Sequence, residues 1–282
     1  MAVPARWALL IVALQPLANI RPPIDVLDLF VGPRRGGCGV AKACRAENLA
    51  ALTYDCLHDP ANRDVLNPRG LETLILYLLR VKPEGLVVLG PPCSNWIGLS
   101  RFCHGRTRLF PRGYTTLPTV RIANAIAEVV AEVLQFCDAR GLAYFIEQPS
   151  TSVLFHYPAV AAAIAAGLAT RVTWHMGAFG FRTPKASTGY CSAWWALIFV
   201  ERARRLLRRQ KELWRKKSKR LYAKHKSKTG RIYYSGNRAM LLATSYPTNF
   251  CKALVALHFR WRNYAVPMRY RGDGNWYRGD GN

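Results

Sequence analysis

The sequence contains few acidic residues. It has 16 Asp and Glu against 41 Lys and Arg in 282 residues, which gives a formal net charge of +25 and a pI near 10.3. This balance favours a polyanion, because each phosphate that a basic side chain neutralises releases counterions. We expect a nucleic acid as the partner, with an acidic membrane surface as the alternative.

The eight cysteines lack the spacing of a metal site. None stands in a Cys-x-x-Cys pair, and no cluster of Cys and His has the spacing of a zinc finger. We therefore predict no metal. Scattered thiols are typical of proteins in a reducing compartment, so we expect an intracellular location, and a nuclear one if the source is a eukaryote.

The sequence also lacks an apolar run that would cross a bilayer near its N-terminus. The uncharged stretch between Arg6 and Arg21 is shorter than the about 20 residues that a membrane-spanning helix needs. We predict no transmembrane segment. Residues 1–20 are predicted to form an N-terminal extension that packs on the following domain as a helix or strand, and a secretory signal peptide is the alternative.

Standard phosphate-binding motifs are missing as well. The chain has no Gly-x-Gly-x-x-Gly fingerprint and no Walker Lys-Ser/Thr pair, which excludes the usual dinucleotide and P-loop sites. It has instead Asp28-Leu-Phe30-Val-Gly32, followed by a Gly-Gly pair. Glycines between a strand and a helix let the backbone approach a ligand, and Asp55 ends the next strand, where a carboxylate can hold ribose hydroxyls. The pattern predicts a nucleoside-containing cofactor, and a structural turn is the alternative.

Short apolar runs alternate with helical periodicity over residues 21–192. Strands are predicted at residues 24–30, 50–55, 86–89, 144–146 and 171–176, and helices at residues 40–48, 71–81 and 120–139. Strands that alternate with helices build a parallel sheet with helices on both faces. We therefore predict an α/β fold with a mostly parallel, doubly wound sheet.

Basic residues dominate the chain beyond this domain. Residues 193–238 are predicted as a basic helical insertion, in which Leu206, Leu213 and Trp214 recur at helical spacing. A solvated helical face is one interpretation, and the interleaved aromatic residues favour a nucleic-acid surface. A C-terminal helix over residues 239–262 is predicted to return to the domain. The Gly-rich repeat over residues 263–282 is predicted to be disordered.

Two residues with catalytic chemistry follow predicted strands. Cys93 ends the sequence Gly-Pro-Pro-Cys, in which the prolines fix the backbone and direct the thiol. Glu147 ends the strand at residues 144–146. Both positions lie at the carboxyl edge of the sheet, where α/β proteins bind ligands. A thiol that faces a carboxyl can combine nucleophilic attack with proton donation. Core packing for Cys93 and loop capping for Glu147 are the alternatives.

These motifs, in this order, resemble those of cytosine-5 methyltransferases. The resemblance covers about residues 24–150 and consists of Asp-Leu-Phe-x-Gly, Gly-Pro-Pro-Cys and the strand that ends in Glu147. Weaker similarity continues at residues 177–185 and 245–253. The whole pattern is similar to uncharacterised methyltransferase-like proteins that occur in many copies in some protist genomes. The family typically has Asn-Val after the Glu, where this chain has Gln148 and Pro149.

The resemblance implies a Rossmann-like fold that binds S-adenosylmethionine (SAM) and an enzyme that methylates carbon 5 of cytosine in DNA or RNA. Cys93 would attack carbon 6 of the base, and Glu147 would engage ring N3. The residues implied to bind the cofactor are Asp28, Phe30, Gly32, Gly36, Gly37, Asp55, Asp64, Pro91 and Pro92. The residues expected to contact nucleic acid are Arg182, Lys185, Arg204, Arg208, Lys216 and Lys219.

Two other functions stay open at this point. One is a catalytically degenerate relative that binds nucleic acid through the basic segment. The other is a SAM-dependent enzyme with a different substrate, in which Cys93 is structural. The adenine-N6 class is disfavoured, because its Asp/Asn-Pro-Pro-aromatic turn is replaced here by Gly-Pro-Pro-Cys. The motifs do not set the target sequence, the polymer or the oligomeric state.

Overall fold

The fold is built around one mixed sheet. A computed structural model describes residues 4–32, 39–98, 101–181, 183–217, 222–226, 232–236, 246–260, 268–270 and 276–278. Its largest sheet has six strands in the order β2-β1-β3-β4-β6-β5. Their bounds are β1 (Ile24–Leu29), β2 (Ala51–Tyr54), β3 (Val81–Leu89), β4 (Ala143–Pro149), β5 (Thr170–His175) and β6 (Ala186–Cys191).

The strand order creates a switch point between β1 and β3. Strands β2, β1, β3 and β4 pair in parallel, and β6 is antiparallel to both β4 and β5. This arrangement confirms the predicted mostly parallel α/β sheet. From β1 the chain moves outward to β2 and then returns to β3 on the other side. Open α/β sheets bind ligands at the carboxyl ends of strands where the order reverses in this way.

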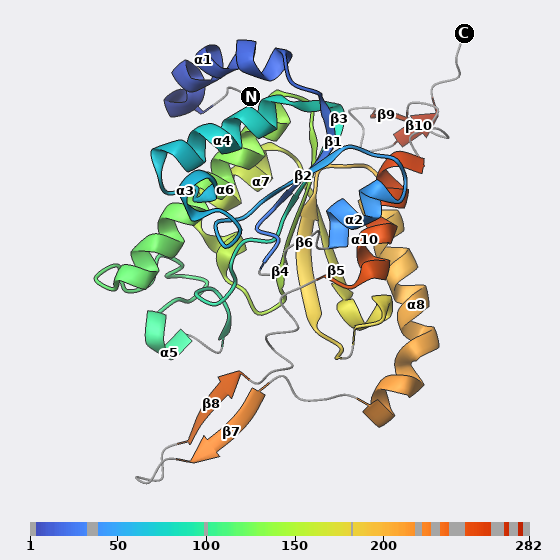
Figure 1. Cartoon of the computed structure of the whole chain (residues 1–282). Helices are drawn as coiled ribbons and strands as arrows, with labels where there is room; N and C mark the ends of the chain where they lie inside the picture. The colour runs from blue at the N-terminus through green and yellow to red at the C-terminus, as the bar shows by residue number, and fades with distance from the viewer. Residues whose placement is uncertain are drawn as a thin grey trace.

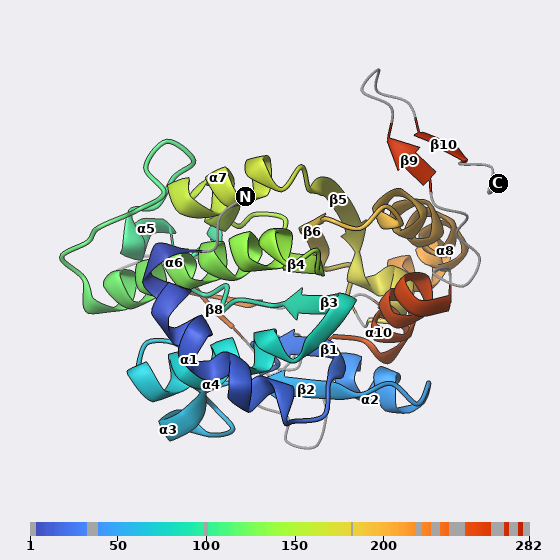
Figure 2. The same cartoon turned by 90° about the horizontal axis from the view of Figure 1, so that it is seen from above.

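Helices cover both faces of the sheet (Figures 1 and 2). Alternate residues of a strand point to opposite faces, so Leu27 and Leu29 belong to one core and Val26 to the other. One face carries α1 (Ala8–Asn19), α4 (Pro68–Leu79), α6 (Pro118–Ala139) and α7 (Pro158–Ala166). The other carries α2 (Gly39–Arg45), α8 (Ala196–Lys217) and α10 (Thr248–Val255). Burial on both faces explains why the parallel strands are nearly continuous apolar runs.

Shorter elements join these layers. Those that bear on the site or its surroundings are η1 (Ala5–Trp7), α3 (Pro60–Arg63), α5 (Arg101–His104), η3 (Leu154–His156), η4 (Met176–Phe179) and η5 (Ala256–Arg260). The N-terminal extension is the helix α1, which packs on α4. Trp7, at its start, is fully buried and contacts Phe136 of α6. Among the described helices, none combines the length and the apolar character that a membrane crossing requires.

The structure corrects several predicted boundaries, among them the end of the strand before Glu147, which continues to Pro149, and it adds a strand to the sheet. The helix predicted at residues 71–81 begins at Pro68 and ends at Leu79, while Val81 already pairs with Ile24 in the sheet. The prediction is wrong at this end because β3 continues through Pro83, which normally breaks a strand. Strand β6 has few large apolar residues, and its identity as a strand comes from its pairing with β4 and β5.

The basic C-terminal part starts inside the domain. Phe199, in the first turns of α8, is fully buried in the core that includes Phe145 of β4. Helix α10 packs against α2. Two antiparallel pairs complete the described chain: β7 (Tyr222–Lys226) with β8 (Ile232–Gly236), and β9 (Met268–Tyr270) with β10 (Trp276–Arg278). The first pair lies within residues 193–238, which we expected to be a helical insertion, and the second lies within the repeat that we expected to be disordered.

Candidate active site

The carboxyl end of β1 has an unusual backbone. Phe30 has a φ of +62°, and Gly32 a φ of +81°. The left-handed region is rare for a bulky residue such as Phe, and strain of this kind is found mainly at functional sites. Asp28 is only 2% exposed, and its burial, followed by the nearby charge of Asp55, raises its pKa well above the usual value. The turn thus places a buried carboxyl beside the switch point.

Asp55 ties the turn after β1 to the turn after β2. Its Oδ2 accepts a hydrogen bond from the backbone N–H of Gly32 at 2.8 Å, and its Oδ1 accepts one from the N–H of Leu57 at 2.8 Å. Asp64 lies just after α3, where its Oδ1 accepts from the N–H of Leu66 at 3.0 Å. Gly36 and Gly37, which the resemblance assigns to the cofactor, lie outside the described residues.

The chemistry at the ends of β1 and β2 fits a nucleoside-bearing cofactor. Each oxygen of Asp55 keeps a second lone pair after its backbone contact, and the carboxylate stands where ribose hydroxyls bind in related sheets. His58, three residues further on, has a buried Nε2 that finds no hydrogen-bond partner in the structure as described. Buried nitrogens without a partner are uncommon, so this atom suits a polar group of a ligand.

The loop that carries Cys93 is fixed by the neighbouring strand. Gln148 of β4 is almost fully buried, and its Nε2 donates to the backbone carbonyl of Pro91 at 2.6 Å. The hydroxyl of Ser152 donates in turn to Oε1 of Gln148 at 2.9 Å. Pro91 is buried and Pro92 exposed, and the following Cys93 is half-buried. The thiol is therefore held at the surface of the carboxyl edge by a network from β4.

Glu147 reaches the same edge from β4. The side chain is 5% exposed, and its Oε1 accepts a hydrogen bond from the hydroxyl of Ser187 at 2.7 Å. Ser187 belongs to β6, which lies next to β4 in the sheet. The antiparallel strand β6 thus supplies the group that fixes one oxygen of the Glu147 carboxyl.

The structure brings Cys93, Glu147 and Lys185 together. Burial raises the pKa of the Cys93 thiol, the positive charge of Lys185 lowers it, and the negative charge of Glu147 raises it again. Lys185 precedes β6 and has a φ of +30°, a strained backbone for a residue with a side chain. A thiol, a carboxyl and an ammonium group from three separate segments therefore interact at the carboxyl edge.

The other predicted nucleic-acid contacts are more scattered. Arg204 and Arg208 are exposed on α8, where Arg208 lies 3.8 Å from Glu201. Lys216 belongs to the last turn of α8, but its side chain is not among those described. Arg182 and Lys219 lie outside the described residues. Of this set, only Lys185 is placed at the site by the described structure.

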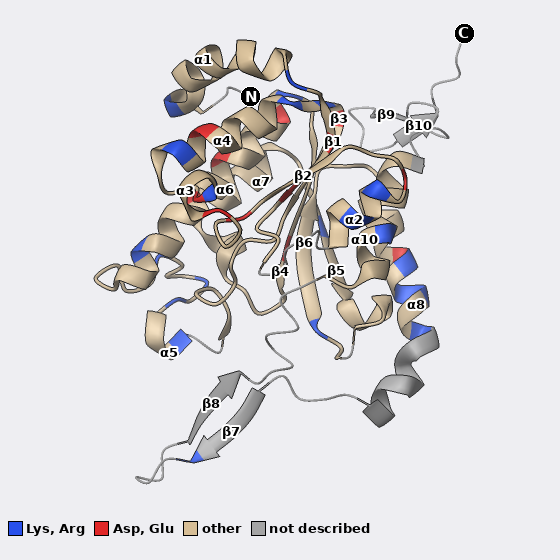
Figure 3. Cartoon of the chain, in the orientation of Figure 1, with Lys and Arg blue, Asp and Glu red and all other residues tan. Residues whose placement is uncertain are grey.

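A further basic segment follows Cys93. Residues 101–121 contain five arginines, and residues 85–127 contain no Asp or Glu. Arg106 anchors the segment: its guanidinium stacks 3.7 Å from the ring of Trp96 and donates to Oδ1 of Asn124 at 2.8 Å. Phe102 and Tyr114, in the same segment, are 92% and 53% exposed. Figure 3 shows basic positions on α5 and on α8, on opposite sides of the carboxyl edge.

Sequence reasoning missed three residues of the site. Gln148 and Ser187 hold the Cys93 loop and the Glu147 carboxyl, and Tyr246 lies close enough to Glu147 and Asp28 to interact with both. The signal for Gln148 was its position directly after Glu147. Ser187 has no local pattern that links it to the site. Tyr246 lies in residues 245–253, where the sequence has a weak similarity to the family that does not single out the tyrosine.

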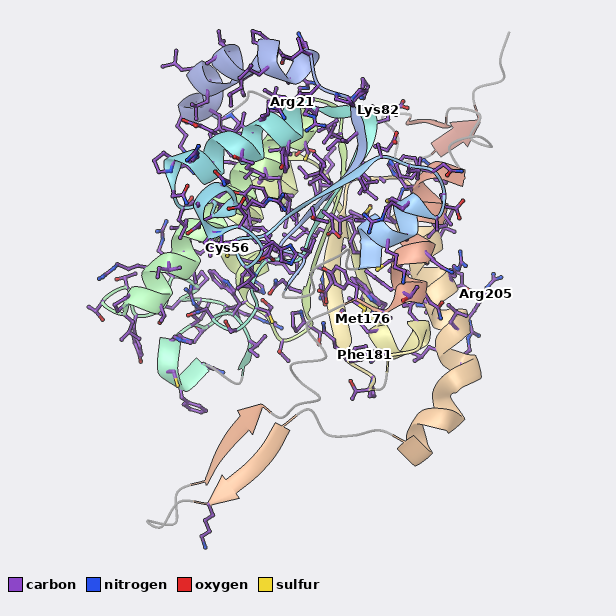
Figure 4. All side chains as sticks on the ribbon, in the orientation of Figure 1. Arg21, Cys56, Lys82, Met176, Phe181 and Arg205 are labelled. Atoms are coloured by element: carbon purple, nitrogen blue, oxygen red, sulfur yellow. The ribbon has the colours of Figure 1, made fainter. Side chains whose placement is uncertain are left out.

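The described part of the chain contains no cluster of His, Cys, Asp and Glu that would hold a metal ion. Comparisons with protein-family models and with curated protein sequences find no match to this chain. The geometry of the carboxyl edge is therefore the basis for assigning a function. Cys56, after β2, and Met176, after β5, mark the two sides of this edge in Figure 4.

Proposed function

We propose that the chain is a SAM-dependent methyltransferase that acts on carbon 5 of cytosine in a nucleic acid. One observation carries the proposal: Cys93 follows β3, Glu147 lies near the carboxyl end of the adjacent parallel strand β4, and the two interact electrostatically at the edge that also carries Lys185. A nucleophilic thiol beside a proton-donating carboxyl is the pair that attack on a pyrimidine ring requires. The strand order supports the proposal, because its switch point lies directly beside this pair.

The cofactor would be held at the ends of β1 and β2. Asp55 would accept from the ribose hydroxyls, His58 would meet a polar group of the adenosine, and the turn at Phe30 and Gly32 would approach through its backbone. SAM supplies the methyl group when it is bound. This placement agrees with the sequence resemblance to cytosine-5 methyltransferases. It also agrees with the interpretation of the sheet as Rossmann-like.

The residues of this chain would carry out the remaining steps. Lys185 favours the thiolate of Cys93, which adds to carbon 6 of cytosine while Glu147 holds a proton at ring N3. Carbon 5 then accepts the methyl group. Solvent water takes the proton from carbon 5, the Cys93 sulfur departs as the thiolate, and the proton at N3 returns to Glu147, which restores the aromatic ring. In a duplex the base must first leave the stack, at a cost of a few kcal/mol.

A nucleic acid is the substrate class that the surface favours. Exposed arginines and exposed aromatic rings alternate in residues 101–121, next to the Cys93 loop. Arginine attracts phosphates, and aromatic rings stack on bases that are unpaired. The exposed Arg204 and Arg208 extend the positive charge on the other side of the edge (Figure 3).

A trapping experiment tests the proposal. An oligonucleotide with 5-fluorocytosine should form a covalent adduct with the chain in the presence of SAM, since fluorine at carbon 5 cannot leave as a proton does. Mass spectrometry should locate the adduct on Cys93, and Cys93→Ser should abolish it, while Cys103→Ser, which changes an exposed thiol elsewhere, should not. SAM binding without any adduct on DNA or RNA would overturn the methylation of cytosine.

The second candidate function is nucleic-acid binding without catalysis. The observation that favours it is the raised pKa of Cys93, since burial and Glu147 both keep the thiol protonated against the effect of Lys185. A chain of this kind would bind oligonucleotides with a strong salt dependence and would form no adduct. The trapping experiment therefore separates the two functions directly.

A further inference from the structure

Tyr246 places its side chain at the switch point of the sheet. The residue precedes α10, and its ring packs on Phe250 with a centroid distance of 4.9 Å. Gly90 follows β3, and a Cβ atom at Gly90 would lie 2.6 Å from the hydroxyl oxygen of Tyr246. A contact this short does not occur between real atoms of this kind. The absence of a side chain at Gly90 is therefore what admits the tyrosine hydroxyl above the end of β3.

The hydroxyl interacts electrostatically with two carboxyl groups. Asp28 comes from β1 and Glu147 from β4, the strands on either side of β3. Burial, followed by the charges of Glu147 and Asp28, raises the pKa of Tyr246 well above its usual value. The phenol is therefore neutral and has a proton to donate. Its hydroxyl is buried and makes no regular hydrogen bond among the described residues, and Glu147 is an acceptor in range of it.

We propose that Tyr246 is a positioning residue that donates to the Glu147 carboxyl and holds it in register with Cys93. Ser187 already fixes Oε1 of Glu147 from β6, and Tyr246 approaches from the opposite side, above β3. Two donors from opposite sides restrict the rotation of a carboxyl more than one does. The proposal rests on the proposed function for the reaction in which this orientation matters, and on Gly90 and Tyr246 for its geometry.

A double-mutant cycle tests this role. Tyr246→Phe keeps the ring and removes the hydroxyl, and Glu147→Ala removes the carboxyl. With a 5-fluorocytosine oligonucleotide and SAM, we expect Tyr246→Phe to slow adduct formation about 10-fold, because hydrogen bonds to charged groups are among the stronger ones. If Tyr246 acts through Glu147, the double variant should be no slower than Glu147→Ala alone. Two losses that multiply would overturn the proposal.

A second variant tests the geometry independently. Gly90→Ala should push the hydroxyl away from Glu147 and slow adduct formation by a factor similar to that of Tyr246→Phe. In the chain that already carries Tyr246→Phe, the same methyl meets the ring carbon Cζ at 3.4 Å and should cost little more. An equal loss in both backgrounds would contradict the placement. Tyr77→Phe, which removes the hydroxyl of a half-buried tyrosine on α4, is the matched control and should leave the rate unchanged.

Failure of the proposed function can be told apart from failure of this inference. If the parent chain forms no adduct, the same cycle is measured as the midpoint temperature of thermal unfolding. A hydrogen bond between Tyr246 and Glu147 makes the shifts of Tyr246→Phe and Glu147→Ala non-additive. Additive shifts would overturn the inference even though the fold was intact, and non-additive shifts would support it whatever the reaction.

Discussion

At the residue scale, the reactivity of Cys93 depends on two opposing charges. Burial raises the pKa of the thiol, Lys185 lowers it and Glu147 raises it. Because the thiolate is the nucleophile, each neighbour should change the rate at which the thiol reacts. The two effects have opposite signs, so they can be distinguished from a general loosening of the site.

We predict that Lys185→Met slows the alkylation of Cys93 by iodoacetamide several-fold at pH 8, and that Glu147→Gln accelerates it. Rates are measured across a range of pH by mass spectrometry of the peptide that contains Cys93. Cys103 is exposed in the same molecule and provides an internal control whose rate should not change. Changes of the same sign in both variants would show that the charges of Lys185 and Glu147 do not control the thiol.

Asp138 at the end of α6 provides a pH-dependent test of the core. The carboxyl packs closely on Gly167, where an added Cβ atom would lie 2.3 Å from its Oδ2. Burial raises the pKa of Asp138 to about 6. The folded chain therefore binds this proton more tightly than the unfolded chain, in which the pKa is about 3.9. The contribution to stability is complete below about pH 4 and is lost as the pH rises through about 6.

We expect Asp138→Asn to raise the free energy of unfolding by about 1–3 kcal/mol at pH 7.5, because it removes the cost of burying the carboxylate. At pH 4 the variant and the parent chain should have nearly the same stability, since the Asp is then neutral. Urea unfolding at both pH values measures the difference. An equal gain at pH 4 and pH 7.5 would mean that the ionisation of Asp138 is not responsible.

At the scale of elements, the sequence predicts what local patterns determine. Strands β1 and β4 and helix α6 are recognisable because their apolar periodicity is strong and Gly or Pro stands beyond their ends. Cys93 and Glu147 follow from the same logic, since strand ends in a parallel sheet share one edge. Strand β6, Ser187 and Tyr246 were not predictable, because pairing and contacts with distant segments give them their roles.

The link between β4 and the Cys93 loop leads to a further prediction. Gln148→Leu leaves the Pro91 carbonyl and the Ser152 hydroxyl without their buried partner. We expect a loss of about 2–4 kcal/mol in the free energy of unfolding, because each unsatisfied buried group costs about 1–3 kcal/mol. Ser152→Ala, which leaves the bond from Gln148 to Pro91 in place but removes those of the Ser152 hydroxyl to Gln148 and from the N–H of Leu154, is the control and should cost about 1–2 kcal/mol.

The Gln148→Leu variant also tests whether Gln148 holds the Cys93 loop in place. Hydrogen exchange at Trp96 and Ile97, whose N–H groups donate to the Cys93 carbonyl, should become faster in Gln148→Leu and change little in Ser152→Ala. Such a change reports local opening of the loop rather than global unfolding. Equal protection in both variants would show that Gln148 does not hold the loop.

At the scale of the whole molecule, the positive charge is arranged around the candidate site. The segment with α5 lies on one side of the carboxyl edge and α8 on the other, and the views in Figures 1 and 2 agree on this placement. A polyanion that contacted both would cross the carboxyl edge of the sheet. Arg21, by contrast, precedes β1 and lies at the opposite edge of the sheet (Figure 4).

The arrangement predicts which arginines set the salt dependence of nucleic-acid binding. Each phosphate contact contributes about 0.7 to the slope of log K against log salt for single strands and about 0.9 for duplexes. Arg101→Gln with Arg108→Gln should therefore reduce the slope by about 1.4–1.8. Arg204→Gln with Arg208→Gln should do the same, and Arg21→Gln, exposed but remote, should leave it unchanged. Fluorescence anisotropy of a labelled oligonucleotide at several salt concentrations measures all three. Because Arg21→Gln removes one charge and each pair removes two, a slope reduced half as much by Arg21→Gln would mean that net charge alone attracts the polymer, and that the two flanks of the carboxyl edge are not its path.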